Sequence, residues 1–238
     1  MDSWLQPLSG EVSAAIDACL AQGKGRRIAC FDADGTLWSE DIGEAFLRWL
    51  IAGGLLPRVA DLGDPYADYE RRVRENRTAG YEWAVTSMAG LAEQDVRLWA
   101  RQLAAAWPNW RPAMSSLVRG LAARRCEVWI VSASNGWIIE AAAPTMGFDP
   151  GNALGIRTAV VDGILTDRVV RPVPSEGGKV EVIRRCIGEV PMLAFGDSLG
   201  DLAMLEAADQ PVVVGRHDQP GASILEIARQ RGWPITLF

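Results

Sequence analysis

The chain places two aspartates, Asp32 and Asp34, directly after an apolar run, in the stretch FDADGTLW from Phe31 to Trp38. In an extended strand, residues two positions apart point to the same side. Two carboxylates held so close repel each other, and one of them tends to stay protonated. Catalysis often divides nucleophilic and acid–base work between two such groups, so this stretch is the first candidate for chemistry.

Composition and charge limit the classes of protein to consider. The chain has 238 residues, of which 49% are hydrophobic, which suits a soluble globular protein of one domain or two small ones. No apolar run approaches the roughly 20 residues of a membrane span. The segment MDSWLQPLSGEVS lacks the pattern of a secretory signal, so we expect a cytoplasmic protein without membrane contact. The net charge of −6 argues against nucleic acid as the main partner, and nothing in the sequence indicates an oligomeric state.

Histidine and cysteine are too scarce for several common mechanisms. The only histidine is His217, which has no nucleophile motif near it, so we interpret it as a surface-loop residue rather than a general base. The four cysteines are far apart and form no CxxC pair, which argues against a zinc site. Cys30 and Cys126 lie in apolar strand-like runs and are predicted to be buried free thiols.

Strand and helix signals alternate along most of the chain. Buried strands are predicted in RRIACFDAD, CEVWIVSAS, PMLAFGDS and PVVVG, and a hairpin in residues 156–169 around Asp162–Gly163. Helical patterns occupy residues 8–20, a segment after Pro112, and residues 178–186, 199–207 and 222–229. The alternation predicts an α/β fold, a Rossmann-like doubly wound parallel sheet with helices on both faces.

The strand signal disappears between about residues 39 and 111. An apolar helical face runs from Ile42 to Leu50 and stops at Gly53–Gly54, and further helical patterns cover residues 66–89 and 93–107. We therefore predict a helical cap over residues 39–111, inserted into a core formed by residues 1–38 and 112–238.

Four short motifs follow the predicted strands or begin the predicted helices. They are Asp32-x-Asp34-Gly35-Thr36, then Ser132, then Lys179, and then Gly196-Asp197-Ser198-x-x-Asp201. Each alone has an ordinary structural explanation as a turn, a cap or a surface charge. Ligands of open α/β sheets bind beyond the carboxyl ends of the strands, where three of these motifs lie. Their order and strand context together predict an active site.

In these motifs the chain resembles the phosphatases of the haloacid dehalogenase superfamily, over about residues 26–38 and 115–210. The resemblance implies that Asp32 attacks phosphorus and forms an aspartyl phosphate. Asp34 would protonate the leaving alkoxide and then take a proton from the hydrolytic water. Ser132 and the main-chain N–H of Ala133 would bind phosphoryl oxygens, Lys179 would stabilise the pentavalent state, and Thr36 would brace the loop. An acid at position 34 also separates the chain from true dehalogenases, whose halide leaves without a proton.

The resemblance also implies a metal ion. An anionic nucleophile needs a cation to approach a phosphate ester, and Mg²⁺ prefers oxygen ligands in octahedral geometry. The expected protein ligands are Asp32, the main-chain carbonyl of Asp34, and Asp197. Asp201 would orient a metal-bound water or hold Lys179.

The layout of the insertion and the hairpin is similar to that of phosphoserine phosphatases and their phosphocholine-type relatives. By position, Asp41, with Glu40 beside it, would contact a substrate amine. The alternative is ordinary helix N-terminal chemistry, with Ser39 as N-cap and acids in the first turn. Trp38 offers either a cation–π face for an ammonium group or hinge packing.

The leaving group is not fixed by these motifs. Relatives often have Ser-Gly-Gly where this chain has Ser132-Ala133-Ser134, which argues against a simple transfer of serine specificity. Arginines able to hold a substrate carboxylate are candidates only by their place in the insertion, namely Arg71, Arg74 and Arg77. The leading hypothesis is a Mg²⁺-dependent phosphomonoesterase for a small phosphorylated amine. The alternatives are a phosphomutase or other phosphotransferase of the same superfamily, and a catalytically idle binding domain.

Overall fold

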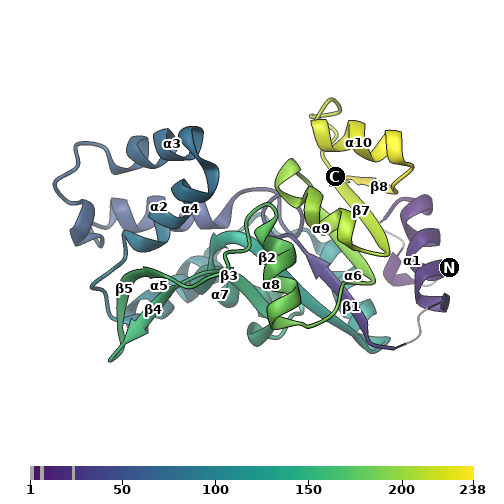
Figure 1. Ribbon diagram of the computed structural model, residues 1–238, viewed down its shortest axis with the longest axis horizontal. Helices are drawn as coiled ribbons and strands as arrows, with labels where there is room; N and C mark the ends of the chain where they lie inside the picture. Colours follow the sequence, from purple (N-terminus) through teal and green to yellow (C-terminus); the bar gives the residue numbers. More distant parts are fainter. Residues whose placement is uncertain (1–2, 6–7, 23–24) are drawn as a thin grey trace.

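The computed structural model describes residues 3–5, 8–22 and 25–238, and its centre is a parallel sheet in the strand order β3-β2-β1-β6-β7-β8 (Figure 1). Every neighbouring pair in this sheet runs in parallel. The strands are β1 Arg27–Phe31, β2 Cys126–Asn135, β3 Ala153–Ile156, β6 Leu193–Gly196, β7 Gln210–Gly215 and β8 Ile235–Leu237. The predicted α/β fold with a Rossmann-like sheet is confirmed.

Both faces of the sheet are buried, as the continuous apolar runs in its strands require. Phe31 and Phe195, on adjacent strands, point to one face and stack with ring centroids 4.4 Å apart. Their neighbours Cys30 and Ala194 point to the other face and belong to a second core layer. The first face is covered by α1 Gly10–Gln22, α6 Pro112–Ala123 and α7 Gly136–Met146, and the second by α8 Gly178–Cys186, α9 Leu202–Ala207 and α10 Ser223–Arg231.

Four helices connect β1 to α6, where the strand signal was missing from the sequence. They are α2 Ile42–Ala52, α3 Pro65–Glu75, α4 Arg77–Thr86 and α5 Glu93–Ala106, with a 3₁₀ turn at Pro57–Val59. Figure 1 shows α2, α3 and α4 at the end of the molecule farthest from α1 and α10, while α5 lies beside α7. The two-stranded hairpin of β4 Thr158–Val161 and β5 Ile164–Val169 lies at the same end.

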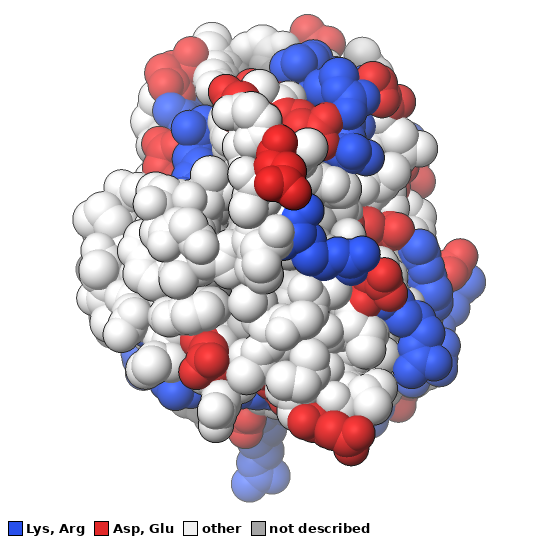
Figure 2. Space-filling view, turned by 90° about the vertical axis from the view of Figure 1, so that its left-hand side faces the viewer, with Lys and Arg blue, Asp and Glu red and all other residues white. Residues whose placement is uncertain are grey.

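The surface of this end carries charges of both signs. Figure 2 shows acidic and basic side chains interspersed over its upper part, where α3 lies, and a broad area at lower left with few charged side chains. On α3, Arg71 pairs with Glu75, and Arg72 pairs with Asp68 at 2.9 Å. Because these charges are paired, no broad field of one sign covers α3.

Side-chain capping sets two helix boundaries that the apolar pattern alone could not locate. Asp41 caps α2 by accepting a hydrogen bond from the main-chain N–H of Glu44 at 2.7 Å, so the sequence interpretation of Ser39 as the N-cap is wrong. Asn76 ends α3 in an extended conformation and caps α4 through the N–H of Ala79. The helical pattern over residues 66–89 is therefore two helices rather than one.

Other differences concern the far edges of the sheet. The hairpin is confirmed, but Ile156 belongs to β3 and pairs in parallel with Asn135 of the main sheet. The helix α7 and the short edge strand β8 were not predicted from the sequence. The buried state of Cys30 and Cys126 and the exposure of His217 are confirmed.

Ion pairs to Glu140 and main-chain hydrogen bonds connect α5, the hairpin and α7. Glu140, on α7, forms ion pairs with Arg97 of α5 and with Arg157, which precedes β4. The hairpin also bonds to the segment before α5, where Leu165 donates to Leu91 O at 2.9 Å and Gly90 donates to Leu165 O at 2.8 Å. Burial alone would raise the pKa of Glu140, but the hydrogen bonds from Arg157 and Arg97 outweigh burial and lower it.

We expect the substitution Glu140→Gln to reduce the free energy of unfolding by roughly 1.5–3 kcal/mol at pH 7, the usual contribution of hydrogen bonds to a charged group. Since the folded state lowers the pKa of Glu140, this stabilisation is complete above the ordinary carboxyl pKa and is lost as the pH falls through the folded value. Urea unfolding of both proteins between pH 3 and pH 7 measures the difference. Glu127→Gln, at an exposed ion pair, is the control and should change stability by less than about 1 kcal/mol. A Glu140→Gln effect no larger than that of the control would contradict this role.

Candidate active site

The side chains with chemical potential meet at the carboxyl ends of β1, β2 and β6. Asp32 follows β1 directly, and its main-chain N–H donates to Phe195 O of β6 at 2.8 Å. Ser132 lies near the end of β2, and Asp197 follows β6. Parallel strands end at one edge of a sheet, so this topology brings together residues that are far apart in the sequence.

Lys179, on the first turn of α8, links two of these carboxylates. Its Nζ donates to Asp32 Oδ1 and to Asp201 Oδ1, each at 2.6 Å, and its side chain is 3% exposed. Burial alone would lower the pKa of Lys179, but the charges of Asp201 and Asp32 outweigh burial and raise it. The ammonium therefore stays protonated and supplies a fixed positive charge beside Asp32.

Three carboxylates lie close enough to share a cation. One oxygen from each of Asp32, Asp197 and Asp201 lies within 4.8 Å of the other two. Ligand oxygens around Mg²⁺ at its usual bond length of about 2.1 Å are separated by roughly 3–4 Å, so the spacing suits such an ion. Burial and the charge of Asp201 raise the pKa of Asp32, and the same causes raise that of Asp197 to about 7. A single ammonium leaves this cluster short of positive charge, and a divalent cation would supply it.

Asp201 is held firmly as part of a capping box. Its Oδ2 accepts hydrogen bonds from the main-chain N–H of Asp197 at 3.1 Å and from that of Ser198 at 3.0 Å. Its Oδ1 remains directed at Lys179. Asp201 therefore positions both the ammonium and the loop that carries Asp197.

Asp34 lies next to this cluster in a different environment. Its Oδ1 accepts hydrogen bonds from Trp38 Nε1 and from the N–H of Ile42, both at 2.7 Å, and Ser134 Oγ donates to its Oδ2 at 2.6 Å. Burial raises the pKa of Asp34, and these hydrogen bonds oppose the rise. The paired aspartates of the first motif therefore differ in their partners, since Asp32 faces an ammonium and Asp34 faces neutral donors.

The turn that follows Asp34 needs a glycine. Gly35 has φ +81°, and a Cβ there would lie 2.1 Å from Asp197 Oδ2. The buried guanidinium of Arg111 donates to the carbonyl oxygens of Gly35 and Thr36. The Oγ1 of Thr36 donates to Asp197 Oδ1 at 3.3 Å. The loop that carries both aspartates is thus fixed from behind by hydrogen bonds.

A cavity of about 300 Å³ opens onto these groups. One wall is the sheet edge, with Asp32, Asp34, Ser132, Lys179 and Asp197. The opposite wall comes from α2, α3 and α4, and its side chains are Asp41, Glu44, Leu47, Leu50, Tyr69, Arg77, Tyr81 and Ala84. The cavity therefore joins a charged end to an end lined by tyrosines, leucines, acids and one arginine.

The sequence candidates divide clearly between residues that line this cavity and residues that do not. Glu40, Asp41 and Ala133 line it. Asp41 is the helix cap, and its expected contact with a substrate amine stays a prediction. Among the three candidate arginines, Arg77 lines it, whereas Arg71 is engaged at the surface by Asp68 and Glu75 and Arg74 is exposed away from it.

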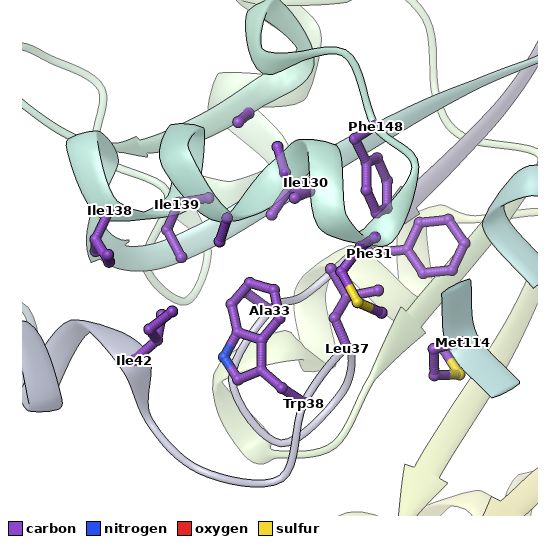
Figure 3. Close-up of a cluster of buried hydrophobic side chains, with 14 of the residues drawn as sticks. Phe31, Ala33, Leu37, Trp38, Ile42, Met114, Ile130, Ile138, Ile139 and Phe148 are labelled. Carbon is purple, nitrogen blue, oxygen red and sulfur yellow. The ribbon is translucent and has the colours of Figure 1, made fainter. Parts of the chain in front are cut away.

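Trp38 and Thr36 do not line the cavity. The cation–π interpretation of Trp38 is therefore wrong and its packing alternative fits, while Thr36 lies where a residue that braces the loop is expected. Trp38 is 0% exposed and packs edge-on against Trp110, with ring centroids 5.4 Å apart. Figure 3 shows it enclosed by the buried cluster that includes Ala33, Leu37 and Ile42. Its indole face is covered and offers no surface for an ammonium group. Thr36 is also 0% exposed, and its hydroxyl is directed at Asp197.

Sequence reasoning missed four residues of the site. Tyr69 and Tyr81 line the cavity, Ser134 contacts Asp34, and Arg111 holds the loop that follows Asp34. Only Ser134 had a signal in the sequence, because this chain has a serine where relatives often have the last glycine of Ser-Gly-Gly. The others depend on how the inserted helices pack, which no local pattern reports.

The geometry supports nucleophilic chemistry on an anionic ester. A buried carboxylate lies beside a fixed ammonium, a second carboxyl group lies nearby among neutral donors, and Ser132 and Ala133 line the same cavity. Residues 29–206 match the model of the haloacid dehalogenase-like hydrolases, and the chain belongs to this family. The predicted family and its class, that of hydrolytic enzymes, are confirmed.

Individual relatives agree with this placement. The probable phosphatase Rv3661 of Mycobacterium tuberculosis is 29% identical over 234 residues, covering 90% of this chain and 76% of that protein. A protein of unknown function from Bordetella pertussis Tohama I superposes with a TM-score of 0.77 at 21% identity, covering 89% of this chain and 98% of that one. A substrate-bound phosphoserine phosphatase superposes with a TM-score of 0.56 at 19% identity, covering 86% of this chain and 91% of that one. Among the residues that the structure describes, no helix is both long and apolar enough to cross a bilayer.

We expect Lys179→Met to destabilise the fold by roughly 3–5 kcal/mol in the absence of divalent cations, because it leaves the buried carboxylates of Asp32 and Asp201 without their counter-charge. Urea unfolding in EDTA measures the change. Arg184→Met, at an exposed position of the same helix, is the matched control and should be nearly neutral. A loss below about 1 kcal/mol for Lys179→Met would contradict the proposed electrostatic role.

Proposed function

We propose that this enzyme is a Mg²⁺-dependent phosphomonoesterase that hydrolyses a small phosphorylated amine through an aspartyl-phosphate intermediate. The observation that carries the proposal is the buried contact of Lys179 with Asp32, next to an independently held Asp34, at one end of the cavity. The probable phosphatase among the relatives and the phosphoserine phosphatase among the structural neighbours support it.

In the first half-reaction, Asp32 forms a bond to phosphorus while the ester P–O bond breaks. The leaving oxygen takes a proton from Asp34. Lys179 stabilises the charge on the transferring group, and Ser132 with the N–H of Ala133 binds its oxygens. In the second half-reaction, Asp34 takes a proton from water, whose oxygen attacks phosphorus and releases Asp32 and inorganic phosphate.

The metal site fits this chemistry. Asp32, Asp197 and the main-chain carbonyl of Asp34 would hold Mg²⁺, and Asp201 would orient its water or hold Lys179. When bound, the ion supplies positive charge that lets an anionic carboxylate approach an anionic ester. We also propose that residues 39–111 act as the cap that closes the cavity, since α2, α3 and α4 form one of its walls.

The wall opposite the sheet supports an amine leaving group. Asp41 and Glu44 supply carboxylates there, whereas Arg77 is the only arginine among the described residues that line the cavity. Glu44 is already engaged by Arg48 and Tyr66, which leaves Asp41 as the better partner for an ammonium group. Arg77 would meet a substrate carboxylate if the leaving group is an amino acid.

The proposal as a whole is tested with a panel of phosphomonoesters that includes phosphoserine, phosphoethanolamine, phosphocholine and glucose 6-phosphate. We expect release of inorganic phosphate with Mg²⁺, none after exhaustive treatment with EDTA, and recovery when Mg²⁺ returns. Ca²⁺ should inhibit, because its looser coordination allows Asp32 to bind it through both oxygens and spoils the line of attack. Full activity in the chelated protein would rule out the metal-dependent mechanism.

The nucleophile is tested by Asp32→Asn, which keeps the size of the side chain but cannot form an acyl phosphate. We expect a folded protein with less than about a thousandth of the wild-type kcat on p-nitrophenyl phosphate. Asp149→Asn, in an exposed turn away from the cavity, is the control and should keep full activity. Asp32→Asn activity within tenfold of wild type would refute the assignment.

Substrate choice is tested by two variants on the wall opposite the sheet. Asp41→Asn should lower kcat/KM for phosphoserine and phosphoethanolamine by about tenfold to a hundredfold, because a charge-assisted hydrogen bond is worth roughly 1.5–3 kcal/mol. Arg77→Met should harm phosphoserine more than phosphoethanolamine, which has no carboxylate. If wild-type enzyme turns over glucose 6-phosphate as well as the amines, Asp41 is only a helix cap.

A further inference from the structure

The carboxyl group of Asp34 is held by three donors from separate segments. Trp38 comes from the loop after β1, Ile42 is the first residue of α2, and Ser134 lies near the end of β2. The three contacts measure 2.6–2.7 Å and leave the carboxyl group no free rotation. The two oxygens of Asp34 differ in what surrounds them.

The partners of Oδ1 can only donate. An indole N–H and a main-chain N–H have no lone pair to accept a proton, so Oδ1 cannot carry one while both contacts remain. The hydroxyl of Ser134, at Oδ2, can donate to a carboxylate and can also accept from a carboxylic acid. The arrangement therefore admits an acid proton at Oδ2 alone.

We infer that Ser134 is a positioning residue that holds Asp34 with Oδ2 as the atom that gives and takes the proton. This inference rests on the proposed function. In the first half-reaction, the Oδ2–H group turns from Ser134 Oγ to the leaving oxygen, its O–H bond breaks as the alkoxide gains the proton, and Ser134 then donates to the carboxylate Oδ2. In the second, a water O–H bond breaks, its proton returns to Oδ2, and Ser134 turns back to accept.

The surroundings of Ser134 are built to admit its hydroxyl. A Cβ at Gly43, in the first turn of α2, would lie 2.6 Å from Ser134 Oγ and 2.7 Å from its Cβ. Gly43 does not have a positive φ, so space rather than backbone conformation explains a glycine in this helix. The N–H of Ser134 also donates to Ser132 Oγ at 3.1 Å, which fixes the end of β2. The contact with Asp34 is thus supported from both sides.

The test compares two leaving groups in the presence of Mg²⁺. An alkyl ester such as phosphoethanolamine needs a proton on its leaving oxygen, whereas 2,4-dinitrophenyl phosphate releases a stable anion without one. We expect Ser134→Ala to lower kcat/KM for the alkyl ester about tenfold to a hundredfold, and to change that for the dinitrophenyl ester by less than about threefold. Ser134→Thr keeps a hydroxyl and should recover the alkyl ester to within about threefold of wild type. Ser13→Ala removes a buried hydroxyl of α1 far from the cavity and is the matched control.

Equal losses for both esters, no loss for either, or failure of Ser134→Thr to recover the alkyl ester would each overturn the inference. If Ser134→Ala does not fold, Trp38→Phe removes an Oδ1 donor and should show the same selective loss. A crystal structure of Ser134→Ala gives a readout that needs no turnover: the Asp34 carboxyl group should be rotated, and an unchanged orientation would overturn the positioning role. A wild-type enzyme that hydrolyses neither ester would defeat the proposed function, and the crystal structure would still decide whether Ser134 positions Asp34.

Discussion

The burial of several carboxylates at one edge of the sheet is the constraint on which the rest of this structure depends. Asp32, Asp197 and Asp201 lie within reach of one ion, and Lys179 is the ammonium that contacts two of them. Taking carboxylates out of water costs several kcal/mol each unless they are paired. The helix that carries Lys179, the capping box around Asp201 and the sharp turn at Gly35 all serve to place compensating groups there.

The same constraint explains why the loop after β1 is supported so heavily from behind. Arg111, itself buried, donates to the carbonyl oxygens of Gly35 and Thr36, and Thr36 bonds to Asp197. Trp38 packs behind the same loop, and its indole N–H donates a hydrogen bond to Asp34. An aromatic residue that the sequence suggested for substrate binding is therefore part of the support, because its ring packs in a T-shaped contact with Trp110 while its one polar atom reaches Asp34.

The central part of the fold could be predicted because its signals are local. The strands are buried on both faces and read as continuous apolar runs, and Asp32, Ser132 and Asp197 stand where those runs end. Lys179 and Asp201 lie on helical segments and were predicted from the order of the four motifs and the family resemblance. The cavity wall made by Tyr69, Tyr81 and Arg77 could not be, since it depends on how α3 and α4 pack over the sheet edge. Likewise, α7 is apolar nearly all round and contains Pro144, so its sequence lacks the one-sided pattern that identifies a surface helix.

The hydrogen bond from the N–H of Ile42 to Asp34 joins the first residue of α2 to the proposed acid–base residue of the site. Helices α2, α3 and α4 form the wall across from the sheet, whereas α5 is paired with Glu140 of α7 and the segment before α5 is hydrogen-bonded to Leu165 of the hairpin. Any displacement that lifts α2 from the sheet edge to admit a substrate also withdraws this donor from Oδ1. With the cap and the acid–base role proposed above, this single main-chain contact would link closure of the cavity to proton transfer.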